Sequence, residues 1–395
     1  MPYPPQSIRR RRFLLLLGTS LTLSVWACRP ASQTPPDITI GVIAPLSGEL
    51  AATAGQATLR GAELAVSEVN EAGGLEVGNT RQKVALAIAD DRDSPDEAVA
   101  AATRLINEKN VVALVGLPLS RIAIPVADLA ERAGIPTVSS WSTNPQTTAG
   151  KEYIFRVAFT DDFQGQVIAR FASENLEATT AAVLYDIASD YNRGLAEIFK
   201  QEFEGFGGQV VAFESYTTDQ RDFGVQLRQI RDSGAEILFL PNYDNEVPRQ
   251  ARQGRELGIT ARLMGSDTWG GLSSIEHPEL EGAFFTDHWN IAVENSTAQS
   301  FIETYQKIYG SPPESAAALS YDATRLVLTA IRNQGRADPE SIRDGLAKIE
   351  KYEGVTGTLQ FQGNGDPLRS VVVLQFQSGK PVLYDQVNPE FRSVD

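Results

Sequence analysis

The stretch from Val111 to Pro145 constrains the fold more than any other part of the sequence, because it holds two apolar runs separated by a helical pattern. Val111 to Val115 is a continuous apolar run of the kind found in a buried parallel strand. Apolar residues then recur at helical spacing as far as Ala133, and Ile135 to Val138 forms a second short run. A strand, a helix and a strand in this order predict a βαβ unit with parallel strands.

Both predicted strands run into turns that are rich in hydroxyl groups. Ser120 lies in the first turn, and Ser142 and Thr143 lie in the second. Ligands of open parallel sheets bind beyond the carboxyl ends of the strands, and backbone N–H groups at the start of a helix suit an anion. We therefore interpret the two turns as a receptor for a ligand carboxylate. The alternative, that Ser120 and Thr143 are ordinary helix caps, stays open from this stretch alone.

The same alternation of strands and helices continues along the chain. Further strands are predicted at Ile38–Ala44, Val84–Ala89, Tyr153–Val157, Ala181–Tyr185, Val210–Phe213, Ile237–Leu240, Ala283–Thr286, Gly357–Phe361, Val371–Phe376 and Pro381–Tyr384. Helical patterns separate the earlier strands, and later ones cover Ser296–Tyr309, Glu314–Asn333 and Pro339–Ile349. Each half of the chain thus carries its own βαβαβ set, which predicts an α/β fold with a ligand cleft between two lobes.

The N-terminus is typical of an export signal. Arg9 to Arg12 precede the apolar segment Phe13 to Val25, which is too short and too interrupted for a good membrane-spanning helix. We predict a signal peptide over residues 1–27, and both the twin-arginine and the Sec type stay open. Cys28, the only cysteine, ends the segment LSVWAC, which resembles a bacterial lipobox. We expect a lipid on Cys28 and a flexible tether over residues 28–36, with an unmodified secretory protein as the alternative.

The composition argues against several classes of function. A formal net charge of −15 at pH 7 disfavours nucleic acid and anionic lipid as partners, and no later stretch is apolar enough to cross a membrane. The two histidines lack partners at metal-ligand spacing, and the chain has no dinucleotide-binding glycine motif, P-loop or nucleophile elbow. We predict no enzymatic activity, no cofactor and no metal. The acidic groups Asp90–Asp91 with Asp93, and Asp161–Asp162, are interpreted as helix caps or solvated turns, with metal or acid–base pairs as the alternative.

Several segments together resemble the type I periplasmic binding proteins, in the branched-chain amino acid (Leu/Ile/Val-binding) family of ABC transporter substrate-binding proteins. They are ITIGVIAPLSGELAATAGQATLRGAELAVSEVNEAGGL, VALVGLPLS, GIPTVSSWSTNP, the pattern Arg156…Asp161…Gln164-Gly165, SDYNRG, LMGSDTW and ALSYDATRL. The resemblance runs from Ile38 to about Tyr384. It implies two α/β lobes joined by three crossovers. Lobe 1 is expected to comprise residues 37–159 plus 288–358, and lobe 2 residues 160–287 plus 359–395.

The resemblance also implies which residues contact the ligand. By position, Ser120 and the loop residues Trp141, Ser142 and Thr143 would bind a carboxylate, Tyr191 and Tyr243 would face the ligand from lobe 2, and Asp267 would pair with an α-ammonium group. An α-amino acid needs such a set, because hydroxyl and N–H donors suit its carboxylate and an acid suits its ammonium. A helix cap is the alternative for Asp267. Ala54 stands where the family often has an aromatic residue, which predicts a roomier pocket. Trp141 and Trp269 are candidate walls for an apolar side chain. Arg121 is expected at the surface, and the alternative is that it faces the cleft and meets a second acid on the ligand.

The implied function is an extracytoplasmic substrate-binding lipoprotein of an ABC importer. It would bind a branched-chain or other apolar or neutral amino acid between two closing lobes. Its partners would be this ligand and a permease in the inner membrane, and it would touch the membrane only through its lipid. The alternative is a ligand-sensing receptor of the same fold for amides, urea or small carboxylates. An enzyme of the doubly wound class is disfavoured by the missing motifs.

Overall fold

A computed structural model describes residues 38–274, 276–293 and 295–389. The predicted signal peptide, Cys28 and the tether lie outside the described residues. None of the helices in these described residues is long and apolar enough to cross a membrane.

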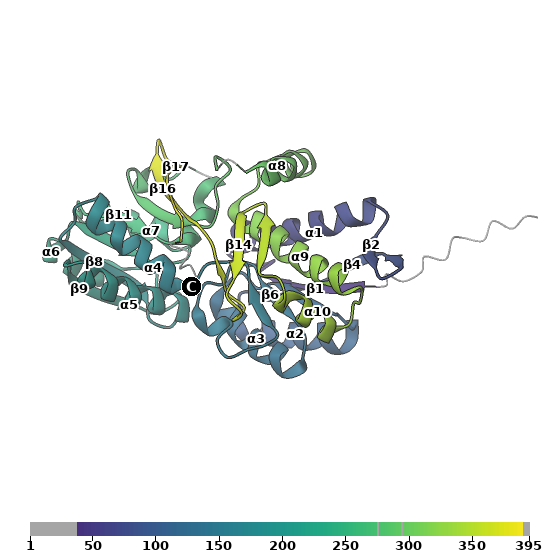
Figure 1. The fold of residues 1–395 in the computed structure, drawn as a ribbon. Helices are drawn as coiled ribbons and strands as arrows, with labels where there is room; N and C mark the ends of the chain where they lie inside the picture. Colours follow the sequence, from purple (N-terminus) through teal and green to yellow (C-terminus); the bar gives the residue numbers. More distant parts are fainter. Residues whose placement is uncertain (1–37, 275, 294, 390–395) are drawn as a thin grey trace, which may run out of the picture. The chain divides into compact units, whose positions relative to one another are not determined.

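The first sheet is wholly parallel, as the βαβ pattern predicts. Its strand order is β4 (Val84–Asp90), β1 (Ile38–Ala44), β5 (Ala113–Gly116), β6 (Thr137–Ser139) and β7 (Ile154–Arg156). Figure 1 shows α2 (Pro95–Lys109) and α3 (Ser120–Ala133) on one side of these strands and α1 (Gln56–Glu71) and α9 (Ser315–Gln334) on the other, and α10 (Pro339–Ala347) packs on α9. A π-helical turn, Ala51–Gly55, leads into α1.

The second sheet has a parallel part and an antiparallel edge. The parallel strands, in order, are β9 (Gln209–Tyr216), β8 (Thr180–Asp186), β10 (Ile237–Leu240), β11 (Arg262–Gly265) and β12 (Phe284–Asp287). Strands β16 (Val371–Gln377) and β17 (Lys380–Val387) continue the sheet in antiparallel sense. Helices α4 (Asp161–Arg170) and α5 (Asp190–Gly205) pack together, as do α6 (Gly224–Ser233) and α7 (Val247–Glu256).

The chain passes between the two sheets three times. It leaves the first sheet after β7, returns after β12 through α8 (Ser296–Tyr309) to α9, and reaches the second sheet again at β16. Two small sheets complete the fold, the hairpin β2 (Leu75–Val77) and β3 (Thr80–Gln82), and the group β13 (Lys351–Gly354), β14 (Gly357–Phe361) and β15 (Pro367–Leu368).

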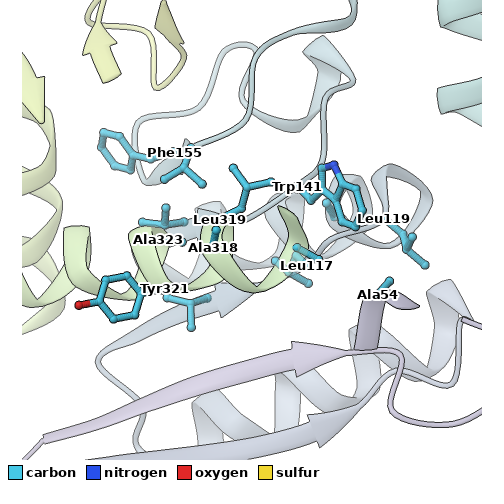
Figure 2. Close-up of a cluster of buried hydrophobic side chains, with 14 of the residues drawn as sticks. Ala54, Leu117, Leu119, Trp141, Phe155, Ala318, Leu319, Tyr321 and Ala323 are labelled. Atoms are coloured by element: carbon cyan, nitrogen blue, oxygen red, sulfur yellow. The ribbon is translucent and has the colours of Figure 1, made fainter. Parts of the chain in front are cut away.

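The largest apolar core contains the first sheet and the helices that cover it. Figure 2 shows part of it, with Ala318, Leu319 and Ala323 of α9 in the same cluster as Leu117 and Phe155. A second apolar cluster contains residues of α6, α7, β8 and β10. Trp269 belongs to this second cluster, where it is fully buried and its indole N–H donates to the Leu240 carbonyl at 3.3 Å. The expectation that Trp269 lines the ligand site is therefore wrong.

Helices α1 and α9 approach so closely that Gly61 has no room for a side chain. A Cβ on Gly61 would lie 2.1 Å from the backbone oxygen of Ala317. We expect Gly61→Ala to lower the free energy of unfolding by about 1–3 kcal/mol, the usual cost of overpacking a core. Urea unfolding measures this. Gly205→Ala is the matched control, because a Cβ at Gly205 in α5 meets nothing within 4 Å, and an unchanged stability of Gly61→Ala would contradict the prediction.

Candidate functional site

Ser120 lies at the turn that follows β5, but it does not cap α3. The N-cap residue is Leu119, and Ser120 is the first helical residue. The buried Ser120 hydroxyl accepts a hydrogen bond from the Ser142 hydroxyl at 2.9 Å and from the backbone N–H of Asn144 at 3.4 Å. The helix-cap alternative is thus wrong for Ser120, whose hydroxyl instead joins the turns after β5 and β6.

The two hydroxyl groups of the turn after β6, those of Ser142 and Thr143, lie in different environments. Ser142 is buried behind Ser120, and its hydroxyl also pairs with that of Thr147 at 2.7 Å. Thr143 precedes the short helix whose N-cap is Asn144, so Thr143 is not a cap either. Its buried hydroxyl has no hydrogen-bond partner among the described residues, and together with Trp141 it lines a pocket.

The acid of the second half is held by two neighbours. Asp267 follows β11 and is almost fully buried. Its Oδ1 accepts hydrogen bonds from the Tyr191 hydroxyl at 2.6 Å and from Gln164 Nε2 at 2.8 Å, and its Oδ2 lies 3.4 Å from His288 Nε2. These contacts replace the helix-cap role that the sequence left open. The Tyr191 ring also packs on the Tyr243 ring, with centroids 5.3 Å apart.

One pocket brings these residues together. Its lining consists of Leu50, Ala54, Pro118, Leu119, Ser120, Trp141, Thr143, Tyr191, Tyr243, Asp244, Asp267 and Thr268. This set includes every predicted ligand contact except Ser142 and the candidate wall residue Trp269. The cavity volume is about 20 Å³, which is room for about one water molecule, so the lining side chains lie close together in this structure.

The pocket lining combines polar side chains from both halves of the chain with a set of apolar side chains. Ser120 and Thr143 come from the first half of the chain, and Asp267 comes from the second. The wall contains Trp141, Leu119 and Ala54, which Figure 2 shows at one end of the apolar cluster. The lining includes acids but, among the described residues, no basic side chain.

Arg121 is not the exposed surface residue that the sequence suggested. Only 19% of its side chain is accessible, and its Nη2 lies 2.6 Å from Asp93 Oδ1. Its guanidinium also lies over the ring of Tyr243, 4.3 Å from the centroid. Arg121 is therefore already paired, and it links the first half of the chain to a pocket residue of the second half through a cation–π contact.

The sequence model of the family described as periplasmic binding protein matches residues 37–381. The chain belongs to the periplasmic binding protein family. Its relatives place it in the branched-chain amino acid subgroup of ABC transporter substrate-binding proteins. The Leu/Ile/Val-binding protein homolog 3 of Brucella melitensis is 32% identical over 343 residues, covering 85% of this chain and 90% of the relative.

Solved structures agree with the type I periplasmic binding protein fold. The leucine binding protein LivK from Thermotoga maritima is 32% identical with a TM-score of 0.83, covering 89% of this chain and 99% of that chain. LivJ from Streptococcus pneumoniae, solved in complex with isoleucine, is 30% identical with a TM-score of 0.81 over 89% of this chain and 99% of that chain. The expected fold class of this periplasmic binding protein is thereby confirmed.

The sequence interpretation missed several residues around the site of this binding protein. Arg156 and Gln164 belonged to a quoted motif without a role, although both are buried and Gln164 binds Asp267. Asp244 lines the pocket next to Tyr243, and burial raises its pKa to about 6. Asp161 was interpreted as a cap or solvated residue, which is wrong, because it is fully buried. Only contacts between distant segments identify these residues.

Buried carboxyl groups should make the stability of this binding protein depend on pH. Burial, together with the Asp267 and Asp162 carboxylates, raises the pKa of Asp161 to about 8, and the charge of Arg156 opposes this only in part. Burial likewise raises the pKa of Asp287 to about 8. The folded state then binds more protons than the unfolded state between the ordinary pKa and about 8, so stability is lost as the pH rises through this window.

We expect the melting temperature of the ligand-free protein to fall by several degrees between about pH 6 and about pH 9. His288 opposes this trend below about pH 6.5, because burial lowers its pKa to about 4 and the unfolded state binds the extra proton. One histidine offsets only part of the effect of the two carboxyl groups, so it flattens the curve on the acid side without reversing it. Scanning calorimetry measures the alkaline limb of the curve. Asp161→Asn should flatten the alkaline limb, and an alkaline limb that rises in the natural protein would refute the assignment.

Proposed function

We propose that this protein is the extracytoplasmic receptor of an ABC importer and that it binds an α-amino acid with an apolar or neutral side chain. The pocket carries this proposal. It offers hydroxyl groups at Ser120 and Thr143 for a carboxylate and the buried acid Asp267 for an ammonium group. Leu119 and Trp141 would pack against the side chain. The names of its relatives, which are leucine- or Leu/Ile/Val-binding proteins, support the same ligand class.

The proposed ligand-binding residues are Ser120, Trp141, Ser142, Thr143, Tyr191, Tyr243 and Asp267. Ser142 would act through Ser120, to which its hydroxyl donates. A ligand with a second acid should bind poorly, because the nearby Arg121 is already paired with Asp93. The pocket lining contains two acids, Asp244 and Asp267, which would repel the second carboxylate of such a ligand.

A ligand screen by thermal shift and calorimetry tests this function. The panel is leucine, isoleucine, valine, alanine, threonine, phenylalanine, glutamate and arginine, together with urea, acetamide and benzoate. We expect one or more neutral amino acids to raise the melting temperature, because a ligand at about 1,000 times its Kd stabilises by about 4 kcal/mol. Stabilisation only by urea, amides or carboxylates without an amino group would favour the sensor alternative and overturn the amino-acid proposal.

The two lobes are proposed to close on the ligand, with lobe 1 formed by residues 37–159 plus 288–358 and lobe 2 by residues 160–287 plus 359–395. Contacts between the halves support this, since Glu49 accepts hydrogen bonds from Arg221 at 2.9 Å and from Asn245 at 3.1 Å. Moving a population from mostly open to mostly closed needs about 5.5 kcal/mol, and micromolar binding supplies about 8 kcal/mol. Small-angle scattering should show a smaller radius of gyration with bound ligand than without it.

Attachment to the membrane is proposed to occur through a lipid on Cys28 after removal of residues 1–27. The motif LSVWAC after an apolar segment supports it. Mass spectrometry of the protein purified from membranes should find an acylated Cys28 at the new N-terminus. Cys28→Ser should release the protein from the membrane fraction, whereas an unmodified N-terminus beyond residue 28 would rule out the anchor.

A further inference from the structure

The motif Arg156…Asp161…Gln164-Gly165 spans the first crossover between the two sheets. Arg156 ends β7, and α4 starts at Asp161. We propose that Arg156 and Gln164 are positioning residues that hold the two charged ends of the ligand site from one short segment. Arg156 orients the loop that binds the carboxylate, and Gln164 orients the acid that binds the ammonium. This inference rests on the proposed function, since it assumes a ligand with both groups.

The loop proposed to bind the ligand carboxylate, residues 142–144, is held in place through the hydrogen bonds that its three successive carbonyl groups accept. The guanidinium of Arg156 is fully buried, and it donates from Nη1 to the Ser142 carbonyl at 2.9 Å and from Nη2 to the Asn144 carbonyl at 3.0 Å. The carbonyl between them, that of Thr143, accepts from the backbone N–H of Asp161 at 3.0 Å. All three carbonyls therefore point toward the crossover.

This arrangement turns the amide groups of the loop toward the pocket. In a planar trans peptide the C=O and the following N–H point in opposite directions, so the N–H groups of Thr143 and Asn144 point away from the crossover. The Asn144 N–H does reach Ser120 Oγ at 3.4 Å, and Ser120 lines the pocket. Neighbouring N–H groups of this kind form an anion-binding concavity.

The guanidinium is itself fixed by further partners. Its Nε donates to Asp366 Oδ1 at 2.6 Å, and its Nη2 donates to the Thr148 hydroxyl at 2.7 Å. Thr148 also donates to Asp366 Oδ1 at 2.7 Å. Only a planar, forked donor satisfies these acceptors together, and a lysine ammonium of equal charge lacks that geometry.

Gln164 is proposed to orient Asp267, the acid that would bind the ligand ammonium. It is fully buried, and its Nε2 donates to Asp267 Oδ1 at 2.8 Å and to the Thr286 hydroxyl at 2.9 Å. The next residue, Gly165, lets α4 sit close to α5, because a Cβ there would lie 2.4 Å from Cγ2 of Ile198. The bond from Gln164, together with the bond from the Tyr191 hydroxyl to the same oxygen, thus holds Oδ1 of Asp267 in place.

The test compares Arg156→Lys and Gln164→Met with three probes, L-leucine, isocaproate (leucine without its amino group) and isoamylamine (leucine without its carboxylate), by calorimetry. Partners that orient ligating groups are worth about 10–100-fold in metal sites, and we expect a loss of about tenfold here. Arg156→Lys should weaken L-leucine and isocaproate and spare isoamylamine. Gln164→Met should weaken L-leucine and isoamylamine and spare isocaproate.

Controls separate positioning from general damage. Arg170→Lys and Gln166→Met change exposed residues of the same helix, α4, and should leave all three affinities unchanged. If Arg156→Lys does not fold, Asp366→Asn should give the same ligand pattern with a smaller loss. Equal losses for all probes, or none, would overturn the positioning proposal while the receptor function stands. Failure of the unmodified protein to bind L-leucine would overturn the leucine-binding assignment and this inference with it.

Discussion

Asp267→Ala is expected to weaken the binding of an α-amino acid by about 2–5 kcal/mol, because the ligand ammonium would be left buried and unpaired. The acid is almost fully buried and lines the pocket, so water cannot readily replace it. Calorimetry with L-leucine, or with another amino acid that the screen identifies, measures the loss. Asp267→Asn keeps the shape and part of the hydrogen bonding, and its loss should be smaller.

The loss of affinity caused by Asp267→Ala should occur only for ligands that carry an ammonium group. Isocaproate has no amino group, so Asp267→Ala should affect its binding far less than that of L-leucine. Removal of the acid also leaves the donors of Tyr191 and Gln164 without their acceptor, so melting curves should accompany the titrations. An unchanged affinity for the best amino acid, in a protein that melts normally, would reject Asp267 as the ammonium partner.

Arg369→Ala is expected to lower the free energy of unfolding by about 3–5 kcal/mol, the range for breaking a buried charged pair or network. Arg369 is buried just before β16, on the third crossover. Its Nη1 donates to the Val157 carbonyl of the first crossover at 2.7 Å, and its Nη2 donates to the His288 carbonyl of the second at 2.8 Å. One side chain therefore ties all three crossovers together.

Urea unfolding tests this expectation. Burial lowers the pKa of Arg369 to about 10, and the Asp322 and Asp287 carboxylates counteract that effect, so the guanidinium stays charged at neutral pH. The control is Arg336→Ala, because 71% of the Arg336 side chain is exposed and its pairing with Asp338 is worth little. A similar, small loss for both variants would mean that Arg369 does not hold the crossovers.

Local patterns predicted most of the regular elements. The apolar runs Ile38–Ala44 and Ile237–Leu240 are strands with the predicted bounds, and Ser296–Tyr309 is a helix with the predicted bounds. Ser94 caps α2, with Pro95 in the first turn and the Ser94 hydroxyl accepting from the Glu97 N–H. These features depend on residues close in sequence, and such interactions are readable without the fold.

Short strands were missed for a related reason. Strand β11 has four residues and begins with the exposed Arg262, and β15 has two residues. The hairpin of β2 and β3 has strands of three residues each. Runs of this length show too little periodicity to be separated from loops, and their pairing partners supply the strand geometry.

The sequence by itself determined the alternating α/β architecture, the likeness to periplasmic binding proteins and the residue types suited to an α-amino acid. Only the tertiary structure decided which of those residues meet. It placed Trp269 in the core and Trp141 at the pocket, put Ser142 behind Ser120, and paired Arg121 with Asp93. The physical reason is that burial and pairing depend on segments far apart in sequence, and a side chain's pattern along one helix or strand carries no information about the partner that another segment brings to it.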